Sequence, residues 1–170
     1  MAYRLKTFRI QFVAESVGYP TGSPCRASED VDRIARSIYG TLDADKEHFL
    51  LLTLNNKNRV NGFKVVSTGS LTASLVHPRE VWRAALHLCA AAVIFVHNHP
   101  SGDPAPSQED QEITRRLKET GDLVGIRVLD HIVLGQERFF SFSDTKGYCS
   151  RLTFALHCEG LGKLAVLSRL

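Results

Sequence analysis

The sequence contains few cysteines, and no two of them are close together. The four thiols stand at Cys25, Cys89, Cys149 and Cys158, with no Cys-x-x-Cys pair among them. A zinc ribbon or a thioredoxin-like redox site needs such a pair, so the spacing argues against both classes of site. We therefore expect reduced thiols in a cytoplasmic protein.

Long apolar runs are also missing. No segment approaches the roughly 18 apolar residues that a membrane span needs. Near the N-terminus Arg4, Lys6 and Arg9 interrupt the apolar residues, whereas a signal peptide requires an unbroken apolar region. We therefore expect neither a membrane-spanning segment nor a cleaved signal.

Neither sign of charge is in large excess. Lys and Arg number 21 against 18 Asp and Glu, which gives a formal charge of +3 and a pI of about 8.7. That balance permits DNA as a partner but lacks the strongly basic stripe typical of nucleic-acid-binding proteins. With 44% hydrophobic and 23% charged residues, the 170-residue chain fits one globular domain of ordinary size.

Helices and strands are expected to alternate through the middle of the chain. Apolar residues at helical spacing predict three helices, at 29–39, 78–89 and 107–121. Shorter apolar runs predict five strands, at 48–55, 63–67, 91–96, 126–134 and 139–142, the first two forming a hairpin. Ser28 and Asp30 are expected to cap the first helix, and Gly121 to end the third. This order is typical of an α/β or α+β domain built on a mixed sheet.

Two terminal segments flank the domain at 28–145. Residues 1–27 are expected to form a strand followed by a linker, because apolar residues alternate first and turn formers crowd residues 18–24. Residues 146–170 carry scattered apolar side chains that could cover a sheet edge, line a homodimer contact or pack on the core. The role of this second segment stays open.

The most informative segment follows the 91–96 strand and begins His97-Asn98-His99-Pro100. Two histidines at i and i+2 of a strand project to the same side, with Cα atoms about 6.7 Å apart, so their imidazoles can converge on one ion. Pro100 ends the strand, and the loop leads to a helix whose first turn carries Asp110. Two imidazoles and one carboxylate leave a fourth zinc position open, which is typical of catalytic zinc.

A catalytic zinc lowers the pKa of water from about 15.7 to roughly 7 and still needs a proton acceptor nearby. Glu47, just before the 48–55 run, is expected at the edge of the sheet within reach of that water. Asp45 and Glu80 are rival carboxylates for this role.

Plainer interpretations of these residues remain open. The two histidines could be solvated loop residues, and Ser107 with Asp110 is also a helix-capping pattern. Asp103 and Glu109 compete with Asp110 as the third ligand, although Glu109 points about 100° around the helix from it. The pair Asp130-His131 lies in an apolar strand, where it is expected to support a ligand imidazole rather than to catalyse.

Taken together, the residues resemble a known family. A Glu, then His-x-His-Pro, six residues, and Ser-x-x-Asp form the pattern of JAMM/MPN+ metalloproteins, and residues 28–145 resemble the bacterial RadC subgroup. The matching segments are Glu47-His48-Phe49, 67–71 (STGSL), 77–81 (HPREV), 97–110 (HNHPSGDPAPSQED) and 125–131 (GIRVLDH).

The resemblance implies a JAB/MPN-like, cytidine-deaminase-like fold, with a mixed curved sheet flanked by helices. It also implies one Zn²⁺ per chain, held by His97, His99 and Asp110. Glu47 would shuttle the proton, and Ser107 would donate a hydrogen bond to the tetrahedral intermediate. The implied activity is that of a metallopeptidase or isopeptidase that uses zinc-activated water on a peptide or protein substrate.

Other functions follow from the same resemblance. Full-length RadC relatives carry an N-terminal helix-hairpin-helix region, whereas about 45 residues precede Glu47 here, so we expect a short, stand-alone form. A DNA-repair-associated or DNA-binding accessory protein with little peptidase activity is the alternative. A non-catalytic interaction module is the third hypothesis, disfavoured by the intact ligand set.

Overall fold

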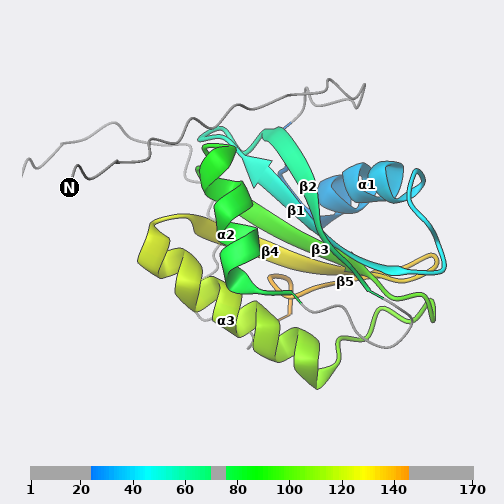
Figure 1. Cartoon of the computed structure of the whole chain (residues 1–170). Helices are drawn as coiled ribbons and strands as arrows, with labels where there is room; N and C mark the ends of the chain where they lie inside the picture. The colour runs from blue at the N-terminus through cyan, green and yellow to red at the C-terminus, as the bar shows by residue number, and fades with distance from the viewer. Residues whose placement is uncertain (1–23, 70–75, 146–170) are drawn as a thin grey trace, which may run out of the picture.

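The computed structural model describes residues 24–69 and 76–145, which form a mixed α/β domain as predicted (Figure 1). The elements are α1 (Ser28–Tyr39), β1 (Glu47–Leu54), β2 (Val60–Gly69), α2 (Pro78–His87), β3 (Ala92–Asn98), α3 (Gln108–Val124), β4 (Arg127–Leu134) and β5 (Phe139–Ser141). The strand expected in the N-terminal segment and any helix after residue 145 lie outside the described residues. Among the helices just named, none has the length and apolarity to cross a membrane.

The five strands form one sheet in the order β2-β1-β3-β4-β5. β1 pairs antiparallel with both β2 and β3, and β5 pairs antiparallel with β4. β3 and β4 are parallel, and α3 is the crossover that parallel neighbours require. The sheet is therefore mixed, and β1 and β3 are inner strands.

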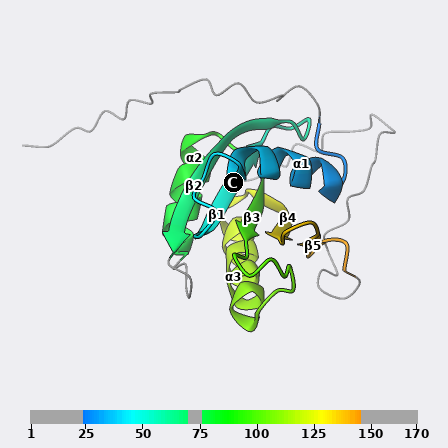
Figure 2. The same ribbon diagram turned by 90° about the vertical axis from the view of Figure 1, so that its right-hand side faces the viewer.

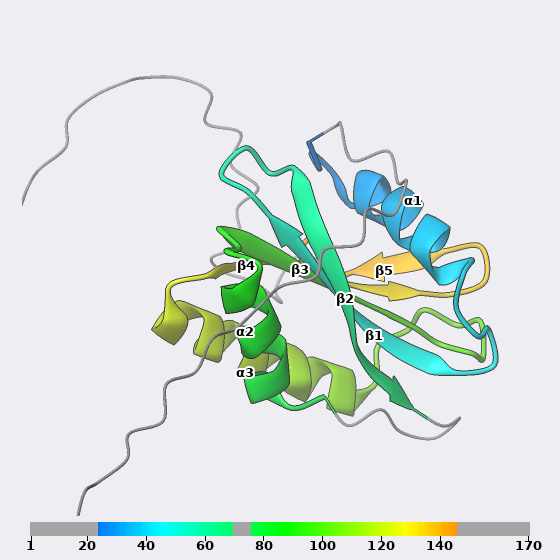
Figure 3. The same cartoon turned by 45° about the horizontal axis from the view of Figure 1, so that its top comes forward.

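The helices cover both faces of this sheet (Figures 2 and 3). α1 packs on one face, where its Val31, Ala35 and Ile38 join Leu50 and Leu52 of β1 in one core cluster. The other face is covered by α2 and α3 and holds a second cluster, built from Phe49, Leu51, Val81, Trp82, Phe95 and Leu117. Because both faces are buried, β1 and β3 are continuously apolar rather than alternating.

α1 has nearly the predicted bounds but a different N-terminus. Its N-cap is Ala27, which has no side-chain capping bond, so the predicted capping by Ser28 was wrong, whereas Asp30 lies in the first turn and accepts backbone N–H groups at the helix start. The Ser28 hydroxyl instead donates to Asp144 Oδ2 at 2.6 Å, while an Asp30 oxygen accepts the Arg26 N–H. Both side chains thus hold neighbouring segments against the helix.

α2 begins at Pro78 as predicted, with His77 as its N-cap, but ends at His87 rather than at Cys89. Cys89 has a φ of +50°, a left-handed conformation that cannot continue a helix.

α3 runs past its predicted end at Gly121 and stops at Val124, with Gly125 in the left-handed conformation as the C-cap. Gly121 is instead a buried packing position. A Cβ atom at this residue would lie 2.8 Å from both the Ile126 carbonyl oxygen and Trp82 Cη2. The glycine therefore permits close contact between α3, α2 and the start of β4.

Candidate metal centre

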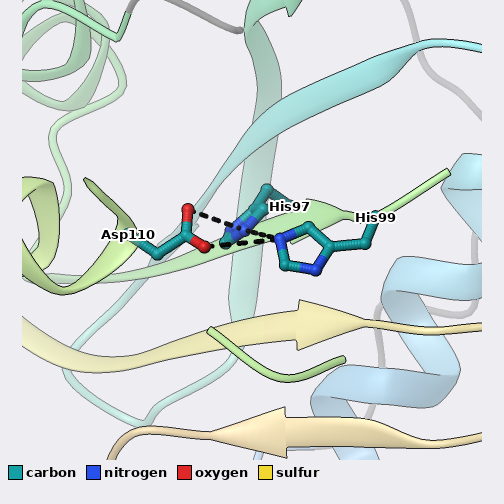
Figure 4. A group of neighbouring side chains, drawn as sticks. All are labelled: His97, His99 and Asp110. Atoms are coloured by element: carbon teal, nitrogen blue, oxygen red, sulfur yellow. Dashed lines mark hydrogen bonds and ion pairs between the residues drawn. The ribbon is translucent and has the colours of Figure 1, made fainter. Parts of the chain in front are cut away.

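Three side chains, from β3 (His97), the loop that follows it (His99) and α3 (Asp110), converge at one end of the sheet (Figure 4). His97 Nε2 lies 3.0 Å from His99 Nε2 and 3.1 Å from Asp110 Oδ1, and His99 Nε2 lies 3.3 Å from Asp110 Oδ2. The His97 side chain is 1% exposed, but those of Asp110 and His99 are 14% and 19% exposed. The cluster is therefore closed behind His97 and open to solvent beside His99.

The loop that follows His99 fixes which of its ring nitrogens carries a proton. His99 Nδ1 lies 2.7 Å from the Asp103 carbonyl oxygen, which can only accept a hydrogen bond. Nδ1 must then carry the proton, and in the neutral ring Nε2 presents its lone pair to the cluster. Asp103, a rival ligand in the sequence, thus contributes its backbone, while its carboxylate accepts the Ala105 N–H.

A chain of hydrogen bonds through His131 and Thr114 holds His97 in the same tautomer. The Thr114 hydroxyl donates to the Asp110 carbonyl oxygen, so it accepts from His131 Nδ1. Burial lowers the pKa of His131 well below its usual value, so this ring is neutral and its Nε2 accepts a hydrogen bond. His97 Nδ1, 2.8 Å away, is the donor, which leaves the lone pair of His97 Nε2 facing Asp110.

With both rings neutral, two lone pairs and a carboxylate face one another at about hydrogen-bond distance, and such a group could hold a metal ion. Burial opposes ionisation of the Asp110 carboxyl, but when the two rings are protonated their Nε2–H groups donate to it, and these hydrogen bonds hold its pKa below the usual range. The hydrogen bond to Asp110 in turn raises the pKa of His99. Tetrahedral zinc with bonds of about 2.0–2.1 Å separates its ligand atoms by about 3.3 Å, close to the spacing seen here.

Ser107 fixes the carboxylate of Asp110 from the start of α3. Its N–H and its hydroxyl both donate to Asp110 Oδ2 at 2.8 Å, and its Oγ accepts the Asp110 N–H at 3.1 Å. This reciprocal capping box is the helix-capping alternative raised by the sequence. The expected role of Ser107 as a donor to a reaction intermediate stays a prediction.

Glu47 is placed beside the cluster by the β1–β3 register. The register ends with Phe49 opposite His97, and continuing the alternation by two residues puts Glu47 on the face of Phe49 and His97, on the side of His99. It lies at the end of an inner strand rather than on the lateral edge of the sheet. Within the described part of the chain, no hydrogen bond or ion pair holds its half-buried carboxylate, and its charge contributes to the raised pKa of His99.

The rival carboxylates lie elsewhere. Asp45 is exposed in the loop before β1. Glu80 lies on α2, where it pairs with Arg83 at 2.6 Å and with Arg79. Glu109 is exposed on α3. Asp45 and Glu109 are thus solvated charges and Glu80 is a surface ion pair.

The pair Asp130-His131 divides between the two faces of the sheet. Asp130 is in register with Ile94 on the α1 side, where it accepts from Ser141 Oγ and the Ser143 N–H. Burial raises the pKa of this carboxyl to about 6. His131 alone contacts a candidate ligand. Sequence reasoning missed Thr114, although its position one turn after Asp110 was a usable signal.

A cleft of about 380 Å³ opens beside His99 and is bounded by α1, the 98–102 loop and the β4–β5 turn. Arg36 braces one wall, because its guanidinium donates to the carbonyl oxygens of Gly135, Gln136 and Arg138. The Gln136 N–H then donates to Gly102 O, and the His99 N–H donates to Leu134 O. The loop that carries His99 is therefore tied to the sheet and, through Arg36, to α1.

Comparison with known proteins gives relatives that are longer than this chain. A UPF0758 protein of Geobacter sulfurreducens is 61% identical over 104 residues, which are 61% of this chain and 45% of that protein. A UPF0758 protein of Trichlorobacter lovleyi is 59% identical over 103 residues, with the same shares. One from Bacillus licheniformis is 55% identical over 103 residues, 46% of its length. The chain thus matches less than half the length of these relatives.

A family model described as the RadC-like JAB domain matches residues 25–148. This range contains all eight helices and strands and every residue of the metal centre. The chain belongs to the RadC-like JAB domain family.

Proposed function

We propose that this protein is a zinc-dependent hydrolase of amide bonds in a peptide or protein, with one zinc held by His97, His99 and Asp110. The observation that carries the proposal is the convergence of two imidazole lone pairs and a carboxylate at 3.0–3.3 Å. Two nitrogens and one oxygen are a ligand set of catalytic zinc, in which a fourth position stays open. The solvent-exposed side at His99 supports access by a substrate.

When bound, zinc would lower the pKa of water to about 7 and polarise the carbonyl under attack. Glu47 would accept the proton at its carboxylate and pass it to the leaving amine. Its half-buried carboxylate has no ion pair among the described residues, which supports this role because both oxygens are available. The Ser107 hydroxyl would turn from Asp110 to donate to the developing oxyanion.

The cleft beside His99 supports a polymeric substrate rather than a very small one. Of the candidate site residues, His99 lines this 380 Å³ cleft, and its walls are held by the Arg36 and Gln136 hydrogen bonds. A rigid cleft next to the reacting atoms can orient residues that flank the cleaved bond.

The first test is zinc content, measured by elemental analysis of the wild type and a His97→Ala/His99→Ala variant whose folding is checked by circular dichroism. We expect about one zinc per wild-type chain and none in the folded variant. Zinc-loaded wild type is then assayed on peptide and isopeptide libraries. Glu47→Gln should keep its zinc and lose about 10²–10⁴-fold in kcat, while Glu80→Gln, the same change at a surface ion pair, should retain activity.

Two results would contradict the proposal. A wild type that binds no zinc when zinc is supplied would exclude the enzyme hypothesis and favour the non-catalytic interaction module. Bound zinc without hydrolysis would favour the DNA-associated alternative, which predicts DNA binding that weakens steeply between low and moderate salt.

A further inference from the structure

Asn98, between the two candidate histidine ligands, joins β3 to the start of β1 through its side chain. Its Oδ1 accepts the His48 N–H at 2.8 Å, and its Nδ2 donates to the Lys46 carbonyl oxygen at 2.9 Å. Each amide atom meets the only kind of partner it can bind, so the orientation of the amide is fixed. The two backbone groups that it holds lie on either side of Glu47.

This side chain acts where the backbone pairing between the strands comes to its end. The β1–β3 register runs from Leu54–Ala92 to Phe49–His97. β3 itself ends at Asn98, and Pro100, two residues later, has no N–H to donate. The Asn98 amide therefore extends the contact by one residue, over the segment that would otherwise be a fraying strand end.

Other contacts fix the residue after Glu47 from further directions. The His48 ring bonds to Thr68 Oγ1 and to the Asp43 carbonyl oxygen, at 3.0 and 2.9 Å. The hydroxyl of the half-buried Tyr39 donates to the His48 carbonyl oxygen at 2.7 Å. The backbone around Glu47 is thus held on all sides, whereas its carboxylate has no bonded partner among the described residues.

We propose that Asn98 is a positioning residue that fixes the backbone on both sides of Glu47 and thereby sets the place of the Glu47 carboxylate relative to His97 and His99. One tripeptide would then carry two metal ligands and the group that aligns the base with them. The catalytic part of this inference rests on the proposed function. The backbone part does not, because it concerns two hydrogen bonds in the metal-free chain.

The test compares Asn98→Ala, Asn98→Asp and the control Asn55→Ala. Asn55 is matched because its side chain also makes two hydrogen bonds to backbone groups: its Oδ1 accepts the N–H groups of Lys57 and Arg59, beyond the far end of β1. Amide hydrogen exchange of His48, followed by NMR, should be at least about tenfold faster in Asn98→Ala and unchanged in Asn55→Ala. Asn98→Asp has the same shape and keeps the acceptor for His48, so its His48 amide should stay protected although the Lys46 bond is lost.

Kinetics then separate positioning from a general loss of structure. Asn98→Ala should bind zinc at wild-type stoichiometry and lose about tenfold in kcat, with KM within about twofold. Asn98→Asp should also lose kcat, because a donor to Lys46 is replaced by an acceptor. In a Glu47→Gln background, Asn98→Ala should cause no further loss, since it acts through Glu47.

The outcomes distinguish the two proposals. Unchanged His48 exchange in Asn98→Ala overturns the inference whether or not the wild type is active. Faster exchange with wild-type kcat, or an additive loss in the double variant, also overturns it. A wild type that cleaves no substrate contradicts the proposed function and the catalytic part of the Asn98 inference. The exchange result still decides whether Asn98 fixes the backbone around Glu47.

Discussion

At the residue scale, the metal centre depends on which ring nitrogen of each histidine carries a proton. His99 is set by one backbone carbonyl, that of Asp103. His97 is set by two side chains in series, His131 and Thr114. Partners of this kind orient a ligand ring and raise its basicity. This chain of hydrogen bonds from Thr114 through His131 to His97 should therefore affect metal affinity, although neither Thr114 nor His131 is itself a candidate ligand.

Thr114→Val should weaken zinc binding by about tenfold, because the isosteric change leaves His131 Nδ1–H without its acceptor and loosens His97. Zinc affinity is measured by competition with a chromophoric chelator. Thr120→Val is the control: its hydroxyl also donates one turn back along α3, to the Arg116 carbonyl oxygen, but remote from the centre. Equal zinc affinities of the two variants would show that this chain of hydrogen bonds does not contribute to zinc binding.

The stability of metal-free protein should fall as pH rises above 6.5. The hydrogen bond to Asp110 raises the pKa of His99, so protonated His99 stabilises the fold fully below its unfolded pKa of about 6.5. That contribution is lost as pH rises through the higher folded pKa. Thermal unfolding in the presence of chelator, at pH 5 and pH 8, measures the difference. In His99→Gln the difference in stability between the two pH values should nearly disappear. If this variant lost as much stability as the wild type, His99 would be excluded as the cause.

At the element scale, α3 contributes both to the candidate metal centre and to the packing of the core. Its first turn carries Asp110, its second supports His131 through Thr114, and its last turns pack Gly121 against Trp82. The sequence could predict this helix from its periodicity and its capping box. It could not predict the end, because a glycine that stops a helix and one that admits an indole ring look the same without the neighbouring helix.

Gly121→Ala should destabilise the protein by about 1–3 kcal/mol, since the added methyl would lie too close to Trp82 and the Ile126 carbonyl. Alanine's better helix propensity, about 1 kcal/mol, would offset only part of this. Urea denaturation measures the change. Asp122→Ala at the exposed next residue should be nearly neutral, and a stabilised Gly121→Ala would mean that the two helices can separate at little cost.

Much of the candidate site was local in sequence and could be predicted. The spacing of His97 and His99 at the end of one strand, the second just past it, and of Ser107 and Asp110 at one helix start is set by local geometry. The supports of the site are not local. His131 meets His97 through the parallel β3–β4 register, and Asn98 meets Lys46 and His48 through the antiparallel β1–β3 register. Strand partners and registers are tertiary information that periodicity does not carry.

At the scale of the whole molecule, the metal centre joins elements from one face of the sheet. His97 lies on the face of the Phe49 and Phe95 cluster and stacks against the Phe49 ring, with centroids 6.1 Å apart. α3 covers the same face, and its Asp110 closes the cluster. An ion bound there therefore connects β3, α3 and the loop after β3.

Zinc should stabilise the folded state as a whole. At a free concentration of 100 times its Kd, a ligand that binds only the folded state adds about 2.7 kcal/mol. Thermal unfolding with and without zinc measures the gain, with calcium at equal concentration as the ion control. The folded His97→Ala/His99→Ala variant should show no shift. A zinc-induced rise in that variant would place the ion elsewhere.

The order of these parts along the chain has a consequence for modularity. His97, His99, Ser107, Asp110, Thr114 and His131 all belong to one β3-α3-β4 unit, residues 92–134, whereas Glu47 comes from β1. The candidate metal ligands and the proposed proton acceptor therefore come from separate segments of the chain. If the proposed function holds, substitutions in β1 alone would remove the proton acceptor and leave the three metal ligands in place.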